Sequence, residues 1–68
     1  MNKFCERLKE LRLERKLSLK HLSNAIGVSD IAISRWENKL RVPNIENLIL
    51  LCKFFNVSAD YLLGLEDI

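Results

Sequence analysis

The chain has 68 residues, of which 49% are hydrophobic and 29% charged, and its formal net charge is +2. A chain of this length buries only about 60% of the surface that its unfolded form exposes, so we expect residues 1–68 to form one small domain of modest stability. One histidine and two cysteines cannot complete a four-ligand zinc site, and there is no clustered set of carboxylates. These features exclude an enzyme, a metal centre and an evident cofactor.

Charge and hydropathy also restrict where the protein acts. Residues 1–43 hold ten Lys or Arg against five Asp or Glu, whereas residues 44–68 hold one against four. The amino-terminal part is therefore the better candidate for contact with phosphates. The apolar runs are too short to span a membrane, and no signal-like segment is present, so we expect a cytoplasmic protein.

The first predicted helix covers residues 3–15. Its apolar positions form an inner stripe of Phe4, Leu8 and Leu11. Taken singly, its basic side chains are expected to solvate the outer face: Lys3, Lys9, Arg15 and the following Lys16. Cys5 and, further along, Cys52 occupy apolar positions and are expected to be buried free thiols.

Residues 18–38 predict two short helices joined by a tight turn. Ser18 can cap a helix over 19–26, Gly27 supplies a left-handed turn, and Ser29 can cap a second helix over 30–38. The apolar positions then face one another across the turn: Leu22 and Ile26 on the first helix, Ile33 and Trp36 on the second. One face of the second helix is left free, as in a helix-turn-helix whose second helix enters the DNA major groove.

Two further helices complete an all-α chain. A basic loop at 39–44 precedes a helix over 45–55, which we expect to be the central helix because its apolar residues exceed one narrow stripe: Ile45, Leu48, Ile49, Leu51, Cys52 and Phe55. Asn56 ends that helix, and a short helix over 59–63 lies between a Ser58 cap and Gly64.

Four segments in order resemble the phage Cro and repressor-type, or xenobiotic-response-element, helix-turn-helix family. Beside residues 18–38 they are RLKELR at 7–12, WEN at 36–38 with Arg41 and Pro43, and NVSADYLLG at 56–64. The resemblance covers nearly the whole chain. It implies a compact five-helix repressor-type DNA-binding domain and a sequence-specific transcriptional regulator, a repressor of phage or bacterial type.

The resemblance also implies an ion pair between Arg12 and Glu37 beneath the DNA-facing surface. The sequence departs from the family at three positions. Leu19 stands where glutamine is common, so that only its backbone N–H can meet a phosphate. Lys16 and Lys39 stand where glycines commonly end helices, which requires either left-handed lysines or different helix ends.

The expected DNA contacts divide into base reading and phosphate positioning. On the free helix face, Arg35 can take guanine, Ser34 can donate or accept, and Ile31 can contact a thymine methyl. Asp30 can either accept from cytosine or support the cap of its helix. Phosphates are expected at the start of the helix over 19–26 and beyond the helix over 30–38: Leu19, Lys20, Asn38, Lys39 and Arg41.

Surplus apolar residues predict a homodimer. Leu40, Val42, Leu65 and Ile68 have no evident interior position and can form a small interface between two copies on a palindromic operator in double-stranded DNA. No small-molecule ligand is evident. The alternative is a protein-interaction module of antitoxin or anti-repressor type, which the exposed Ile31 and the zero net charge of residues 18–38 favour.

Overall fold

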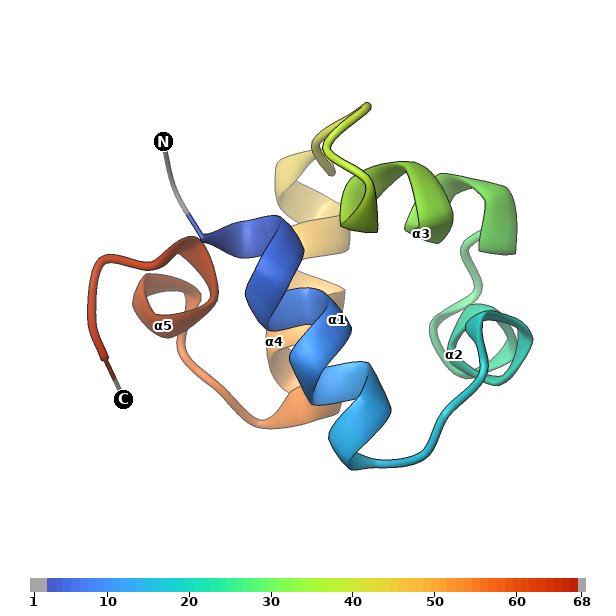
Figure 1. The fold of residues 1–68 in the computed structure, drawn as a ribbon, viewed down its shortest axis with the longest axis horizontal. Coiled ribbons are helices and arrows are strands. Elements are labelled where there is room, and N and C mark those ends of the chain that lie inside the picture. Colours follow the sequence, from blue (N-terminus) through green and yellow to red (C-terminus); the bar gives the residue numbers. More distant parts are fainter. Residues whose placement is uncertain (1–2, 68) are drawn as a thin grey trace.

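A computed structural model describes residues 3–67 and shows the all-α architecture that the sequence predicts (Figure 1). Its five helices are α1 (Phe4–Glu14), α2 (Leu19–Ile26), α3 (Asp30–Glu37), α4 (Ile45–Phe55) and α5 (Ala59–Leu63). The predicted bounds of α2, α4 and α5 are confirmed, and α1 and α3 are shorter than predicted only at their ends. Within the described residues, no helix has the length and apolar character needed to cross a bilayer.

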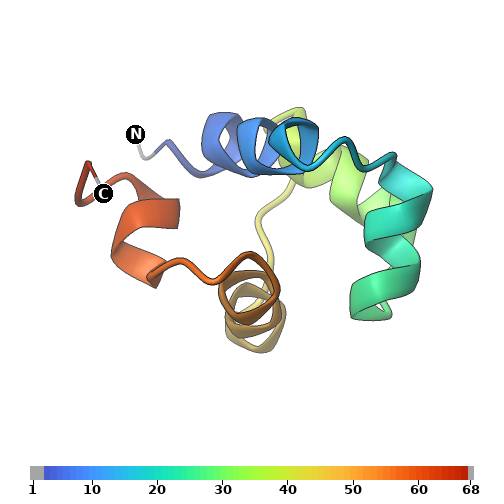
Figure 2. The same cartoon turned by 90° about the horizontal axis from the view of Figure 1, so that it is seen from below.

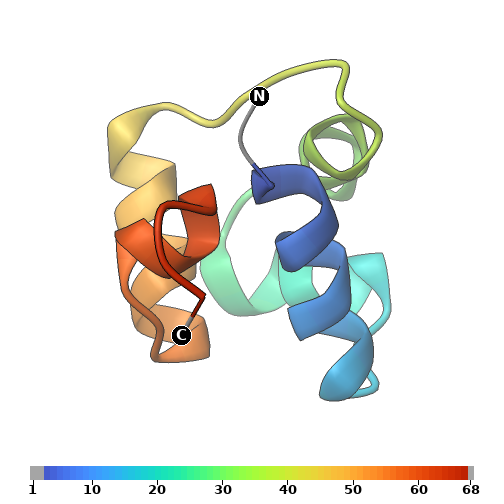
Figure 3. The ribbon, with the colours of Figure 1, turned by 60° about the vertical axis from the view of Figure 1, so that its left-hand side comes forward.

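Helix α1 runs across the others. It packs against α3 and α5, while α2 packs against α3 and α4, and α4 against α5. Figure 2 views α4 nearly end-on below α1, with α5 on one side and the α2–α3 pair on the other. The loop from α3 to α4 runs along one edge of the molecule (Figure 3). This arrangement holds the α2–α3 pair at one end of α1, apart from α5.

Four helices begin at side-chain caps. In each, the cap residue is extended and its side-chain oxygen accepts a hydrogen bond from the backbone N–H three residues later, at 2.8 to 3.1 Å. The cap residues are Ser18, Ser29, Asn44 and Ser58. The helix starts are therefore encoded locally, by single polar residues in front of apolar segments.

The core is built around α1. That helix contributes Phe4, Cys5, Leu8 and Leu11, and the other helices add the remaining buried apolar side chains: Leu22, Ile33, Trp36, Leu51, Phe55 and Leu62. Cys5 is buried, Cys52 is half-buried, and both are free thiols; burial raises the pKa of the Cys52 thiol. The core thus joins all five helices.

The expectation that α4 is the central helix was wrong. Only Leu51 and Phe55 of α4 are fully buried, whereas Ile45 is 75% and Ile49 is 47% exposed. These two residues are one turn apart and share the outer face of the helix. Because α1 already fills the centre, α4 buries one side only and presents apolar surface on the other.

Arg7 and Arg15 contact other parts of the chain. The sequence had led us to expect Arg15 to face solvent on the outer side of α1, without such contacts. The guanidinium of Arg7 lies 4.3 Å from the centre of the Tyr61 ring and donates to the carbonyls of Tyr61 and Glu66. Arg15 donates to the carbonyls of Phe54 and Phe55 at 3.1 and 2.9 Å, at the negative end of α4. Both cations therefore fasten α1 to the carboxy-terminal half of the chain.

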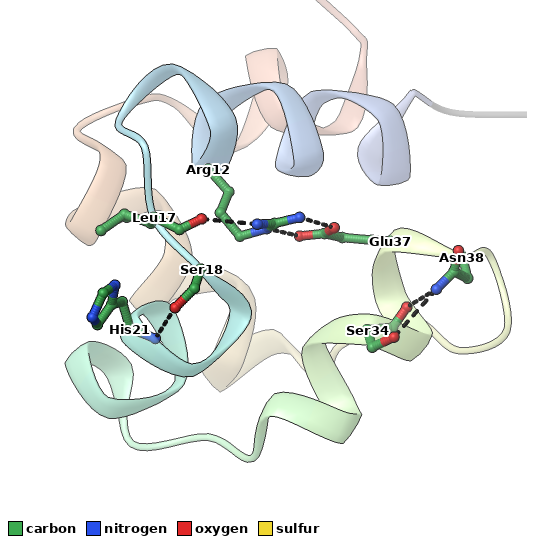
Figure 4. Close-up of polar contacts among 7 residues, drawn as sticks. All are labelled: Arg12, Leu17, Ser18, His21, Ser34, Glu37 and Asn38. Carbon is green, nitrogen blue, oxygen red and sulfur yellow. Dashed lines mark hydrogen bonds and ion pairs between the residues drawn. The ribbon is translucent and has the colours of Figure 1, made fainter.

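A third arginine of α1 holds α3. Arg12 makes two hydrogen bonds to the Glu37 carboxylate, from Nε at 2.7 Å and from Nη2 at 2.9 Å, and a third to the Leu17 carbonyl at 2.8 Å (Figure 4). The Arg12 and Glu37 side chains are only 11% and 5% exposed. The hydrogen bond that Arg12 donates to Glu37 raises the pKa of Arg12 above its ordinary value, so the guanidinium stays charged.

Replacing Trp36 with alanine is expected to lower the free energy of unfolding by about 3–5 kcal/mol, because Trp36 is only 4% exposed and its removal leaves a cavity between α3 and the rest of the core. Urea denaturation of both proteins measures the change. Since Trp36 is the chain's one tryptophan, native fluorescence at the long wavelength of a hydrated indole would contradict its burial.

Replacing Glu37 with alanine should cost about 3–5 kcal/mol, because it strands the buried Arg12 charge. The double variant Arg12→Met with Glu37→Leu is the control: it removes both charges and is expected to recover much of that loss. Denaturation midpoints compare the three proteins. A single variant that costs less than about 1 kcal/mol would show that the pair behaves as a solvent-exposed ion pair.

Candidate nucleic-acid interface

The helix-turn-helix is held together by its inner apolar side chains. Leu22 of α2 and Ile33 of α3 are fully buried, and Val28 in the connecting turn is half-buried. Gly27 ends α2 with a φ of +74°, the left-handed region that a side chain opposes. Ser29 then starts α3 at once. This short connection sets the direction of α3 relative to α2.

The opposite face of α3 is free. Asp30, Ile31 and Arg35 are exposed, Ile31 by 61%, and Ser34 is half-buried. These are the four residues that the sequence analysis assigned to base reading, and the structure places them all on α3. Together they offer a cation, a hydroxyl, an aliphatic surface and a carboxylate, which are the groups that distinguish base edges in the major groove.

A left-handed lysine ends α3. Lys39 has a φ of +64°, and the N–H groups of Lys39 and Leu40 donate to the carbonyls of Trp36 and Arg35 at 3.4 and 2.9 Å. These are the two hydrogen bonds of a Schellman ending, in which glycine usually takes the left-handed position. In this chain Lys39 takes the left-handed position, at a conformational cost of roughly 1 kcal/mol relative to glycine.

Arg35 on α3 and Arg41 beyond this turn line the same depression. It has a volume of about 370 Å³ and lies between α3, the following loop and the start of α4, with Trp36, Asn44 and Asn47 in its wall. Within residues 3–67, neither guanidinium makes an ion pair with a carboxylate. Two arginines without such partners, next to the exposed Lys39, form a local positive surface.

The start of α2 offers backbone donors. Ser18 accepts from the N–H of His21 at 3.0 Å, which leaves the first two N–H groups of the helix, on Leu19 and Lys20, without an intrahelical acceptor (Figure 4). The Leu19 side chain is half-buried in the core, and the Lys20 side chain is exposed. Free N–H groups at the positive end of a helix are suited to an anion.

The Asn38 side chain makes hydrogen bonds to Ser34 of α3. Its Nδ2 donates to the carbonyl of Ser34 at 2.8 Å and to the Ser34 hydroxyl oxygen at 3.2 Å, so the amide is turned along α3 (Figure 4). The pattern of residue types did not reveal this contact, although the spacing of four along a helix permits it.

Three comparisons identify similar proteins. A helix-turn-helix family model matches residues 8–62. The chain is 34% identical over 64 residues to the uncharacterised HTH-type transcriptional regulator YobD of Bacillus subtilis (strain 168), covering 94% of this chain and 57% of that protein. It is 43% identical over 58 residues to repressor protein C2 of Salmonella phage P22, covering 85% of this chain and 27% of that repressor. The chain therefore spans from about a quarter to somewhat over half of these relatives.

The fold has a close counterpart among solved structures. The crystal structure of the P22 c2 repressor protein in complex with a synthetic operator superposes with a TM-score of 0.86 and 40% sequence identity, covering 93% of this chain and 96% of that one. Fold and sequence agree over the same residues. The chain belongs to the helix-turn-helix family of Cro and C1 repressor type, whose members are DNA-binding transcriptional regulators.

Proposed function

We propose that this protein is a sequence-specific transcriptional repressor that inserts α3 into the major groove of an operator. The observation that carries the proposal is the exposed face of α3, where Ile31, Ser34 and Arg35 stand beside the positive surface of Lys39 and Arg41. The similar P22 c2 repressor was solved with operator DNA. Such a regulator acts in the bacterial cytoplasm, where the DNA is.

Base reading falls to α3. Arg35 donates to guanine, Ile31 contacts a thymine methyl, and Ser34 donates to a base edge or accepts from one. Asp30 lies in the first turn of α3, where its carboxylate favours the positive helix end, and it can also accept from a cytosine amino group. Phosphates are met by the backbone N–H groups of Leu19 and Lys20, the Lys20 side chain, Lys39 and Arg41.

Two copies bind a palindromic operator as a homodimer, because one inserted helix contacts only a few base pairs and symmetric half-sites lie about one helical turn apart. Leu40, Val42 and Leu65 are 70%, 74% and 71% exposed, and Ile68 lies outside the described residues. Ile45 and Ile49 on the outer face of α4 are further exposed apolar residues, close in sequence to Leu40 and Val42. We call Leu40, Val42, Ile45 and Ile49 the α4 patch.

The same patch supports a second candidate, a protein-interaction module of antitoxin or anti-repressor type. Selection of bound sequences from random duplex DNA separates the two functions. Enrichment of a palindrome is expected for the repressor. No enrichment at low salt would overturn DNA recognition and favour a protein partner.

Two arginine variants separate base reading from positioning. Arg35→Ala should weaken binding to the preferred site by about 1–3 kcal/mol and relax preference at one base pair. Arg41→Ala removes the same charge but should weaken binding to all DNA sequences alike. It should also make the slope of log affinity against log salt concentration about one unit shallower. Fluorescence anisotropy on specific and random duplexes measures both. Equal losses for Arg35→Ala on the two duplexes would remove Arg35 from the base-reading set.

Replacing Leu40 with glutamate should reduce cooperative binding to a palindromic site without unfolding the domain, because Leu40 is 70% exposed and a buried carboxylate opposes association. Leu13→Glu is the matched control, since Leu13 is a 54% exposed leucine outside the α4 patch. Sedimentation with operator DNA gives the stoichiometry. One protein copy per palindromic duplex at saturation would contradict the dimer.

A further inference from the structure

Ser34 and Asn38 form a hydrogen-bonded pair at the carboxyl end of the exposed face of α3. The Asn38 amide nitrogen donates to the Ser34 carbonyl at 2.8 Å and to the Ser34 hydroxyl oxygen at 3.2 Å (Figure 4). Asn38 is exposed and follows the last residue of α3. The pair therefore lies at the protein surface, with Asn38 in direct contact with a proposed base-reading residue.

The chemistry of the two partners fixes the direction of both hydrogen bonds. A backbone carbonyl only accepts, so the amide group that faces Ser34 must be the NH₂ group and not the amide oxygen. The same NH₂ group then occupies one acceptor site of the Ser34 hydroxyl. Within residues 3–67, the Ser34 hydroxyl hydrogen has no acceptor, and the return bond to the carbonyl four residues earlier, which helical serines often make, is not formed.

We propose that Asn38 is a positioning residue that occupies one acceptor site of the Ser34 hydroxyl and so favours its use as a hydrogen-bond donor toward DNA, which favours a base that presents an acceptor opposite Ser34. This inference rests on the proposed function. In the major groove guanine, adenine and thymine all offer acceptor atoms, whereas cytosine offers its N4 amino donor. Ser34 held in this way discriminates against cytosine on the strand it faces.

The proposal gives Asn38 a role distinct from that of its neighbours. Lys39 and Arg41 add positive charge and act on every sequence alike. Asn38 is neutral, its amide donor is directed at Ser34, and it acts on sequence preference through another side chain. The two roles differ in a measurable way, since a phosphate contact changes affinity uniformly and a positioning contact changes the preference at one base pair.

The test uses operator duplexes that carry each base pair in turn at every position. Ser34→Ala identifies the position that Ser34 faces, as the one whose preference it alters. Asn38→Ala is expected to lower discrimination against cytosine at that same position by about 3- to 10-fold, the effect of one hydrogen bond, with no further loss in the double variant. Lys39→Ala is the control and should leave the preference at that position unchanged.

Asn38→Asp removes the amide donor at nearly constant size. A carboxylate cannot donate to the Ser34 carbonyl or to the Ser34 hydroxyl oxygen, so both hydrogen bonds are lost and discrimination against cytosine at that position should fall as it does in Asn38→Ala. The added negative charge weakens binding to every duplex alike. The relative affinities for the four base pairs at that position therefore still report on Ser34. Circular dichroism checks that each variant is folded, and the χ1 couplings of Ser34, measured by NMR, should change from one rotamer to an average in Asn38→Ala.

Three results would overturn the inference. A uniform loss of affinity in Asn38→Ala, with the base preferences of the wild type, would make Asn38 a phosphate contact. An unaltered preference profile in Ser34→Ala would remove Ser34 from the base-reading set. If the wild-type protein enriches no site from random DNA at all, the proposed function fails together with the inference, and this outcome differs from the other two because it appears before any variant is made.

Discussion

The direction in which α3 presents its free face depends on the buried contact between Arg12 and Glu37. Arg12 donates two hydrogen bonds to the Glu37 carboxylate, at 2.7 and 2.9 Å, and a third to the Leu17 carbonyl in the segment before α2. One guanidinium therefore connects α1, the start of the helix-turn-helix and α3. Bidentate geometry fixes orientation as well as distance. With Trp36 buried next to Glu37, the inner face of α3 is held by both an apolar and an ionic contact.

Net charge describes this protein poorly because its cations have different tasks. Arg7 and Arg12 lie on α1 and Arg15 directly follows it, and the three are satisfied by carbonyls, aromatic rings or Glu37. They stabilise the fold and leave little charge for DNA. The positive surface at the proposed interface comes instead from Arg35, Lys39 and Arg41, at and beyond the end of α3. Three of the ten basic residues in the first 43 positions therefore stabilise the fold, and the cations assigned to the proposed function are Lys20, Arg35, Lys39 and Arg41.

Helix ends and the inner apolar stripe of α1 could be predicted from the sequence, because each depends on residues within about four positions. Ser18 and Ser29 cap as expected, and Lys16 and Lys39 adopt the left-handed conformation that was one of two alternatives. The contacts of Arg7 could not be predicted, since its partners lie 54 and 59 residues away. The exposure of Ile45 also depends on which helix fills the centre. The Ser34–Asn38 pair is local, yet residue types alone do not show whether an exposed amide turns along its helix or toward solvent.

The exposed side of α4 follows from the size of the chain. The five short helices enclose one small core, and a helix as apolar as α4 then has more apolar surface than its neighbours can cover. Ile45 and Ile49 are left outside, close in sequence to Leu40 and Val42 on the loop that leaves α3. That loop also carries Lys39 and Arg41. If two copies associate through the α4 patch, only a few residues separate that interface from α3. The interface would therefore fix the spacing of the two α3 helices, and base reading would depend on association.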